Sequence, residues 1–346
     1  MKSIRPIGYI PATPDTVAEK VLITGANGFV GSYLTQEAIN QGFLTHAGVR
    51  KTSNLQYLTD PRISYLYYSM ENEDQLRENL KAHHFDYIIL NAGVTKAKDR
   101  ESYFKINAGY VRKFCKILIE ENLIPKKLVL ISSLASYGPA DYQVKQILDS
   151  DSVPHPVTWY GESKLQAEQF VQSFRVIPHI ILRPTAVYGP RDTEMISVYK
   201  TVKMGLSPKI GSGNMDATFI HVQDLARLTI DSLKARAQNK AYFVSDGSVY
   251  PIHKFNATVA DLLGKKAREI TIPFSVMKVA AFFSETLGKL QGKAMTLNRN
   301  KIKEYFARSF EMDISDLEKD FNFAPRYSIR KGLEETLEWC IKNKLL

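Results

Sequence analysis

Cysteine is scarce in this chain, and long apolar runs are missing. The 346 residues include only Cys115 and Cys340, which excludes a disulfide scaffold and a Cys-rich zinc site. Residues 1–20 contain basic side chains but no apolar core of a signal peptide, and no window is apolar for long enough to span a bilayer. We therefore expect a protein of the reducing cytoplasm without an integral membrane segment. No group of His, Cys and carboxylate residues has metal-ligand spacing, so no metal is expected either.

The charge is strongly positive, at a formal net value of +10. Its basic residues are spread along the chain, as at Lys126-Lys127 and Lys265-Lys266, and no nucleic-acid-binding module is recognisable. We therefore expect no nucleic-acid partner, and part of the charge is available for an anionic cofactor. Hydrophobic residues make up 44% and charged residues 24%, which is typical of a globular protein.

Short apolar runs alternate with amphipathic stretches over the first two-thirds of the chain. This pattern predicts a Rossmann-type, doubly wound α/β fold with a parallel sheet covered on both faces. We expect the dinucleotide-binding domain at 20–185 and 217–246, and a smaller, mostly helical substrate-binding domain at 186–216 and 247–346. The expected strands lie at 21–24, 44–49, 63–68, 87–90, 128–131 and 180–182, and the expected helices at 29–40, 73–82 and 104–121.

A glycine turn follows the first expected strand and precedes the first expected helix. Glycine lets the backbone approach a pyrophosphate closely, and the start of a helix supplies free N–H groups and a positive dipole end. The spacing differs from Gly-x-Gly-x-x-Gly, but its place between strand and helix favours dinucleotide binding over a plain turn. The residues expected at the cofactor here are Gly25, Asn27, Gly28, Phe29, Val30 and Gly31.

The end of the second expected strand indicates which dinucleotide binds. NAD-preferring enzymes usually have an acidic residue there for the ribose 2′-hydroxyl, whereas this chain has Arg50 and Lys51. A guanidinium binds a 2′-phosphate well, so we expect NADP, with NAD as the alternative. Alternatively, both side chains are simply solvated loop charges.

A tyrosine and a lysine stand four residues apart, at Tyr160 and Lys164. On a helix this spacing puts both on one face, and a nearby ammonium lowers the pKa of a tyrosine from its usual value of about 10. Ser132 and Ser133 follow a buried strand, where α/β folds build their sites. Together these residues indicate acid–base chemistry at a substrate oxygen.

Several motifs follow one another along the chain: Thr24-Gly25-x-x-Gly28-x-x-Gly31, Asn91-Ala92-Gly93, Asn107, Ser132 to Gly138, Tyr160-x-x-x-Lys164, Arg183-Pro184, Tyr188-Gly189-Pro190 and Phe219 to Asp224. In this order they resemble the extended branch of the short-chain dehydrogenase/reductase superfamily, the NAD-dependent epimerase/dehydratase family. The resemblance runs from about Lys20 to the C-terminus.

The resemblance implies roles for the matching positions. Tyr160 would exchange the proton at the reacting carbonyl or alcohol, Lys164 would hold the nicotinamide ribose, and Ser133 rather than Ser132 would steady the substrate oxygen. Further cofactor contacts are expected from Asn91, Ala92, Gly93, Asn107, Pro184 and Val187. Substrate contacts are expected from Thr95, Tyr137 and Arg191. Family members are often homodimers, so a homodimer acting on a small molecule is expected.

Three functions are compatible with these motifs. Sugar-nucleotide epimerases and dehydratases of the family commonly have an asparagine where this chain has Ala186 and an arginine where it has Thr218. Without them an anionic diphosphate loses charge-assisted hydrogen bonds of ~1.5–3 kcal/mol each. This favours a reductase or alcohol dehydrogenase for a less anionic substrate, ahead of an epimerase or dehydratase. A redox sensor without catalysis is the third alternative.

Two further features are assigned from their residue types. His221 is expected to be a structural hydrogen-bonding residue rather than a catalytic one. The apolar stretch Ile272 to Phe283 is expected to be a core helix or an interface, with the cover of an apolar substrate or contact with a membrane surface as the alternatives.

Overall fold

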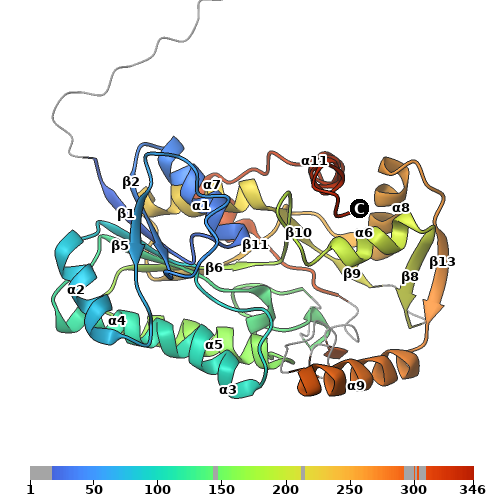
Figure 1. The fold of residues 1–346 in the computed structure, drawn as a ribbon, viewed down its shortest axis with the longest axis horizontal. Coiled ribbons are helices and arrows are strands. Elements are labelled where there is room, and N and C mark those ends of the chain that lie inside the picture. The colour runs from blue at the N-terminus through green and yellow to red at the C-terminus, as the bar shows by residue number, and fades with distance from the viewer. Residues whose placement is uncertain (1–17, 143–146, 212–214, 292–299, 301, 304–308) are drawn as a thin grey trace, which may run out of the picture.

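The computed structural model describes residues 18–142, 147–211, 215–291, 300, 302–303 and 309–346. Within these residues, a sheet of seven parallel strands runs in the order β11-β6-β5-β4-β1-β2-β3 (Figure 1). The strands are β1 (Lys20–Thr24), β2 (Leu44–Val49), β3 (Ser64–Tyr67), β4 (Tyr87–Leu90), β5 (Lys127–Ile131), β6 (His179–Pro184) and β11 (Lys240–Val244).

The sheet confirms the predicted Rossmann-type fold. Its central strands are continuous apolar runs, and every residue of β4 and β5 is buried, because helices cover both faces. The strand order reverses between β1 and β4, and in such sheets ligands bind beyond the carboxyl ends of the strands at this switch point.

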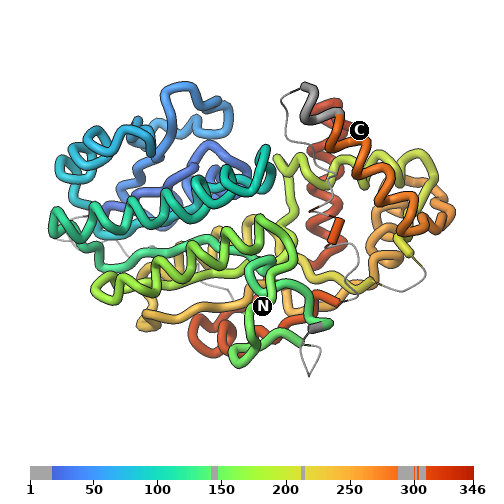
Figure 2. The backbone as a smooth tube through the Cα atoms, turned by 90° about the horizontal axis from the view of Figure 1, so that it is seen from below, coloured from blue at the N-terminus to red at the C-terminus, as the bar shows by residue number. Residues whose placement is uncertain are grey.

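Two groups of helices cover the sheet. α1 and α7 lie on one face, while α2, α4 and α5 lie on the other, with α4 and α5 side by side in both views (Figures 1 and 2). Separate hydrophobic clusters fill the two spaces between sheet and helices. The helices are α1 (Phe29–Asn40), α2 (Glu73–His83), α3 (Arg100–Tyr103), α4 (Tyr110–Glu120), α5 (Trp159–Ser173) and α7 (Val222–Lys234).

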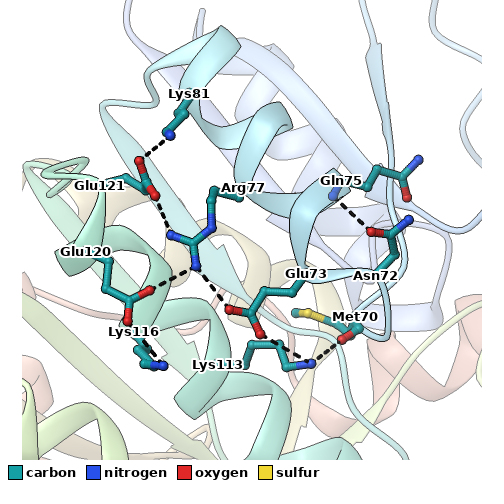
Figure 3. Close-up of polar contacts among 10 residues, drawn as sticks. All are labelled: Met70, Asn72, Glu73, Gln75, Arg77, Lys81, Lys113, Lys116, Glu120 and Glu121. Carbon is teal, nitrogen blue, oxygen red and sulfur yellow. Dashed lines mark hydrogen bonds and ion pairs between the residues drawn. The ribbon is translucent and has the colours of Figure 1, made fainter.

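A network of ion pairs joins α2 to the end of α4 (Figure 3). Arg77 contacts Glu73 at 3.1 Å and Glu120 at 2.9 Å, and it also pairs with Glu121. On the same side, Lys113 of α4 donates to the backbone oxygen of Met70 at 2.9 Å. The segment between β3 and α2 is thus tied to α4.

A third hydrophobic cluster lies outside the sheet and includes the stacked rings of Phe219 and Phe255, whose centroids are 4.7 Å apart. Its separate position agrees with two domains, although the predicted boundaries stay a prediction. The remaining elements are β7 (Ala186–Tyr188), α6 (Ile196–Lys203), β8 (Leu206–Ile210), β9 (Asp216–Ala217), β10 (Phe219–His221), β12 (Tyr250–Pro251), α8 (Ile252–Leu262), β13 (Arg268–Ile272), α9 (Phe274–Gln291), α10 (Ser315–Phe321) and α11 (Ile329–Lys342), of which α10 packs against β11 and α7 of the sheet domain.

Apart from shifts of one or two residues at element ends, the structure differs from the predicted elements in two places. The expected helix at 104–121 begins with a π-helical segment at Phe104–Gly109, and α4 follows it. The apolar stretch at 272–283 is divided by Pro273, because proline has no N–H to donate to a strand or a helix interior. Ile272 ends β13, and α9 begins at Phe274.

Candidate active site

A cleft of about 1340 Å³ opens at the carboxyl ends of the central strands. The turn after β1, the ends of β2, β4 and β5, and the start of α5 form one wall, while α6, β8, α8 and α9 contribute to the other. Most of the site residues expected from the sequence line this cleft, namely Gly25, Asn27, Gly28, Phe29, Val30, Arg50, Asn91, Ala92, Gly93, Thr95, Asn107, Ser133, Tyr160, Lys164, Pro184 and Val187.

The glycine turn packs tightly enough to require glycine at two positions. A Cβ on Gly31 would lie 2.1 Å from the oxygen of Gly25, which would push α1 away from β1. Gly25 has φ of +64°, and a Cβ there would lie 2.9 Å from the Cα of Ala92. Gly28 precedes α1 and has no side chain to cap it, so the first N–H groups of the helix can meet an anion. This cradle fits a dinucleotide pyrophosphate.

Thr24 holds the glycine turn against the neighbouring strand, a role that the sequence analysis missed. Its hydroxyl accepts from the N–H groups of Asn91 at 3.0 Å and Ala92 at 3.1 Å and donates to the oxygen of Ile89 at 3.2 Å. The Asn91 side chain in turn donates to the oxygen of Gly25 at 3.3 Å. Two neighbouring strand ends therefore form one rigid edge.

Arg50 stands where the sequence predicts a contact with the 2′-position of the cofactor. It follows β2, lines the cleft and is exposed, and its backbone N–H donates to the hydroxyl of Ser53 at 3.1 Å. Lys51 is exposed and is not among the residues that line the cleft. A 2′-phosphate would therefore meet one guanidinium here.

Tyr160 and Lys164 lie on successive turns of α5, whose start is capped by the Thr158 hydroxyl. Lys164 is buried, and its ammonium donates to the oxygen of Ile131 at the end of β5 at 2.6 Å. Burial lowers the pKa of Lys164 to about 8, against the opposing attraction of Glu168. Tyr160 is partly exposed, and its ring centroid lies 6.3 Å from that of Tyr103.

The two serines after β5 have different hydrogen-bond partners. Ser132 donates its hydroxyl to the buried carboxylate of Glu168, which also accepts from Ser136 at 2.7 Å. Arg183 also contacts this carboxylate. Its Nε lies 2.9 Å from Oε2 of Glu168, and a terminal guanidinium nitrogen lies 2.8 Å from the same oxygen. The Ser133 hydroxyl instead accepts from the N–H of Ala135 at 3.2 Å, which leaves its own O–H available to the cleft.

Asn107 lies in the π-helical segment and is buried. Its side chain accepts from the N–H of Val94 at 2.8 Å, donates to the oxygen of Val94 at 3.1 Å and donates to Ser163 of α5 at 3.0 Å. It thus satisfies backbone groups next to the cleft and joins the loop after β4 to α5. Its contact with the cofactor stays a prediction.

The structure keeps three predicted site residues out of the cleft lining. Gly31 packs against Gly25 and Ala26 of the turn, and Tyr137 is buried, with the Arg183 guanidinium 4.3 Å from its ring centroid. Arg191, with φ of +77°, donates to the Ser32 hydroxyl of α1 at 2.9 Å and contacts the rings of two tyrosines. These positions lend no support to substrate contacts by Tyr137 and Arg191.

Two buried polar groups of the substrate-side wall have incomplete hydrogen bonding. Asp192 is buried, and within the described residues its Oδ2 has no hydrogen-bond partner, while Oδ1 accepts from the N–H of Glu194 at 2.7 Å. Burial raises the pKa of Asp192 to about 6. Asn256 donates to the hydroxyl of Ser207 at 3.1 Å, and its Oδ1 likewise lacks a partner among those residues.

His221 lies outside the cleft lining. It accepts from the N–H of Gln223 at the start of α7 at 3.4 Å and stacks on Tyr327 at 3.8 Å between centroids. Burial lowers the pKa of His221 to about 4. These contacts agree with the structural role expected for it.

The described residues offer neither a metal site nor a membrane-spanning helix. They contain no group of three or more His, Cys, Asp and Glu side chains placed to hold a metal ion. They also contain no helix with the length and apolar character needed to cross a membrane.

Known proteins resemble the chain over nearly its whole length. A model of the NAD dependent epimerase/dehydratase family matches residues 21–245. An N-acetyl-α-D-glucosaminyl-diphospho-ditrans,octacis-undecaprenol 4-epimerase of Escherichia coli O157:H7 is 24% identical over 331 residues, 93% of this chain and 95% of that protein. A decarboxylating sterol-4-alpha-carboxylate 3-dehydrogenase of Candida albicans is 22% identical over 347 residues, 93% of this chain and 97% of that protein.

Among solved structures, the fold is similar to that of a UDP-glucose 4-epimerase from Thermotoga maritima. The TM-score is 0.76 at 17% identity, covering 94% of this chain and 99% of the other. The similar proteins thus include two epimerases and a dehydrogenase.

Proposed function

This chain belongs to the NAD dependent epimerase/dehydratase family, and on that premise we propose that it transfers a hydride between NADP and a carbonyl or secondary alcohol. The observation that carries the proposal is the position of Tyr160 and Lys164 on one face of α5, in the same cleft as the glycine turn. Ser133 lines that cleft as well. The set supplies a proton donor, a cation and a hydroxyl around one reacting oxygen.

The side chains have separate tasks in this proposal. When bound, the dinucleotide supplies the hydride or accepts it. Tyr160 gives its phenolic proton to the substrate oxygen during reduction and takes it back during oxidation, while Ser133 donates a hydrogen bond to the same oxygen. The Lys164 ammonium favours the tyrosinate electrostatically, and its bond to the oxygen of Ile131 keeps it in place.

Replacement of Tyr160 tests this assignment. We expect Tyr160→Phe to lower turnover by ~10²–10⁴-fold, the usual contribution of general acid–base catalysis, with unchanged NADPH affinity. Tyr103→Phe is the matched control, because Tyr103 lies beside Tyr160 and donates its hydroxyl to the oxygen of Thr95 instead. Steady-state kinetics and fluorescence titration measure the two effects. Full turnover by Tyr160→Phe would contradict the assignment.

The preference for NADP rests on Arg50. We expect Arg50→Ala to weaken NADPH binding by ~10–100-fold, which corresponds to a charge-assisted hydrogen bond of ~1.5–3 kcal/mol, with little change for NADH. Lys51→Ala is the control, since Lys51 does not line the cleft, and it should keep the affinity for NADPH. Wild-type protein that binds NADH as tightly as NADPH would overturn the preference.

Net reduction rather than epimerisation is favoured by the substrate-side wall. Ala186 and Thr218 line the cleft, and the Thr218 hydroxyl donates to the oxygen of Phe310 at 3.1 Å, so neither position offers a charge to a diphosphate. A panel of ketones and aldehydes with NADPH tests this, and we expect stoichiometric loss of NADPH absorbance.

Epimerisation of a sugar nucleotide is the second candidate, favoured by relatives that match over more than nine-tenths of both chains. In that case a sugar nucleotide would be converted without net consumption of the dinucleotide. NADPH binding without turnover of either substrate class would instead support the non-catalytic sensor.

A further inference from the structure

Two side chains of α5 hold consecutive residues at the end of β5. The Lys164 ammonium donates to the backbone oxygen of Ile131 at 2.6 Å, and the Glu168 carboxylate accepts from the hydroxyl of Ser132. Lys164 and Glu168 are four residues apart, so they lie on the same face of the helix. Both are buried, with 6% and 1% of their surface exposed. The end of β5 is therefore fixed to α5 immediately before Ser133.

The same carboxylate also contacts the segment that follows Ser133. It accepts from the Ser136 hydroxyl at 2.7 Å, and the oxygen of that hydroxyl lies 2.8 Å from the backbone oxygen of Ser133. Arg183 of β6 approaches the other carboxylate oxygen at 2.8 Å. Glu168 itself is not among the residues that line the cleft. It thus joins α5, the segment around Ser133 and β6 from behind the site.

The charges of this network are unequal. Lys164 and Arg183 are two buried cations, and Glu168 is the buried carboxylate that accompanies them. A buried cation costs free energy unless an opposite charge offsets it. Burial lowers the pKa of Lys164 to about 8, and the attraction of Glu168 opposes this effect. The carboxylate therefore helps Lys164 to keep the charge that acts on Tyr160.

Other titratable side chains on the surrounding elements do not offer this charge. Those at the cleft or in its buried surroundings are phenols, namely Tyr103 of α3, Tyr110 of α4, Tyr137 after β5 and Tyr160 of α5. Charged side chains of the same elements pair elsewhere, namely Arg100 with Glu162, Lys105 with Glu71, Lys113 with Glu73 and Lys116 with Glu120. Glu101 and Arg112 are exposed.

We propose that Glu168 is a positioning residue of the active site, whose buried carboxylate holds the strand end that binds Lys164 and offsets the charges of Lys164 and Arg183. The proposal rests on the function proposed above for Tyr160 and Lys164. Without the carboxylate, two cations would be buried together, so Lys164 would release its proton at a lower pH. A neutral lysine no longer favours the tyrosinate, and turnover would be lost with that proton.

A titration of Lys164 in the full chain tests the proposal without any substrate. Isotope-labelled lysine gives an NMR signal for each ammonium, and the signal missing from Lys164→Arg identifies this one. We expect half-titration near pH 8 in the wild type and at least ~1 pH unit lower in Glu168→Gln. The glutamine amide can still bond both serines and Arg183, so the variant removes mainly the charge. Circular dichroism verifies its fold.

Ser136→Ala is the matched control, because it removes one hydrogen bond of the same carboxylate and keeps the charge. It should titrate like the wild type. Arg183→Met tests the proposal in the opposite direction and serves if Glu168→Gln does not fold. It removes a cation and leaves the carboxylate to Lys164, so half-titration should move to higher pH.

An unchanged Lys164 titration in folded Glu168→Gln, or an equal shift in Ser136→Ala, would overturn the proposal. A downward shift in Arg183→Met would do so as well. With any substrate that the wild type converts, the loss of kcat at high pH should begin ~1 pH unit earlier in Glu168→Gln. A wild type that converts no substrate would contradict the proposed function instead, while the titration would still decide the role of Glu168.

Discussion

The two walls of the cleft differ in how their buried polar groups are satisfied. On the dinucleotide side, the carboxylate of Glu168 has four hydrogen-bonding contacts, and Thr24 and Asn107 have three each. On the substrate side, Asp192 and Asn256 each have an oxygen without a partner among the described residues. The three groups on the dinucleotide side are thus bonded within the protein, whereas the two on the substrate side each keep a buried oxygen without a partner among those residues.

This difference has a physical meaning. A fully satisfied network holds one geometry, which suits a wall that binds the same cofactor in every reaction. An unsatisfied buried acceptor costs free energy in the empty protein, and a ligand that donates a hydrogen bond recovers that cost. The comparison therefore predicts that removing a polar group costs stability on the dinucleotide wall, whereas on the substrate wall it costs little or increases stability.

The largest effect is expected from breaking the ion pair beneath the dinucleotide wall. Arg183→Met would leave the Glu168 carboxylate buried without its cation and should lower the free energy of unfolding by ~3–5 kcal/mol. Urea denaturation measures the loss. The double variant Arg183→Met/Glu168→Leu removes both charges and should recover much of it, so a double variant as unstable as the single one would contradict a charge effect.

Removal of the Asp192 charge should stabilise the protein instead. Burial raises the pKa of Asp192 to about 6 in the folded state, against about 3.9 for an unperturbed aspartate. Between these values the unfolded chain releases the proton first, so stability falls as pH rises and the loss is complete above about pH 6. Asp192→Asn should therefore gain about 3 kcal/mol at pH 8 and little below pH 4.

Denaturation curves at several pH values check this prediction. Asp320 should make stability depend on pH in the opposite direction, because its hydrogen bond with Lys240 lowers the pKa of its carboxyl. Asp320→Asn should therefore lose stability at neutral pH and match the wild type at low pH. An Asp192→Asn variant that is less stable than the wild type at every pH would show that the buried carboxylate is satisfied after all.

The smallest expected effects come from two uncharged residues, one on each wall. Thr24→Val would leave the N–H groups of Asn91 and Ala92 without their acceptor and should cost ~1–3 kcal/mol. Asn256→Leu would remove an acceptor that already lacks a partner and should change stability by less than ~1 kcal/mol. Thermal unfolding of both variants sharpens the comparison, and equal losses would remove the distinction between the walls.

The predictable parts of the site are local in sequence. Gly25 to Gly31 joins a strand to a helix within a few residues, and Tyr160 and Lys164 share one helix, so residue spacing alone places each group. The parallel sheet was also predictable, since strands buried on both faces are apolar throughout.

Other features depend on contacts between distant segments. The sequence could not predict the π-helical segment that orients Asn107, because its partners Val94 and Ser163 come from two other elements. Nor could it place Arg191, whose side chain turns toward Ser32 of α1 rather than into the cleft. Burial and hydrogen-bond partners of this kind exist only once the chain has folded.

The sequence by itself determined the Rossmann-type sheet, the glycine turn and the Tyr160–Lys164 pair, because each depends on periodicity or on the spacing of close neighbours. Only the tertiary structure decided that the Ser132 hydroxyl donates to the buried Glu168 carboxylate, and that Val279 and Phe283 of α9 are exposed. Both outcomes depend on what packs against a residue from far along the chain, and no local pattern contains that information.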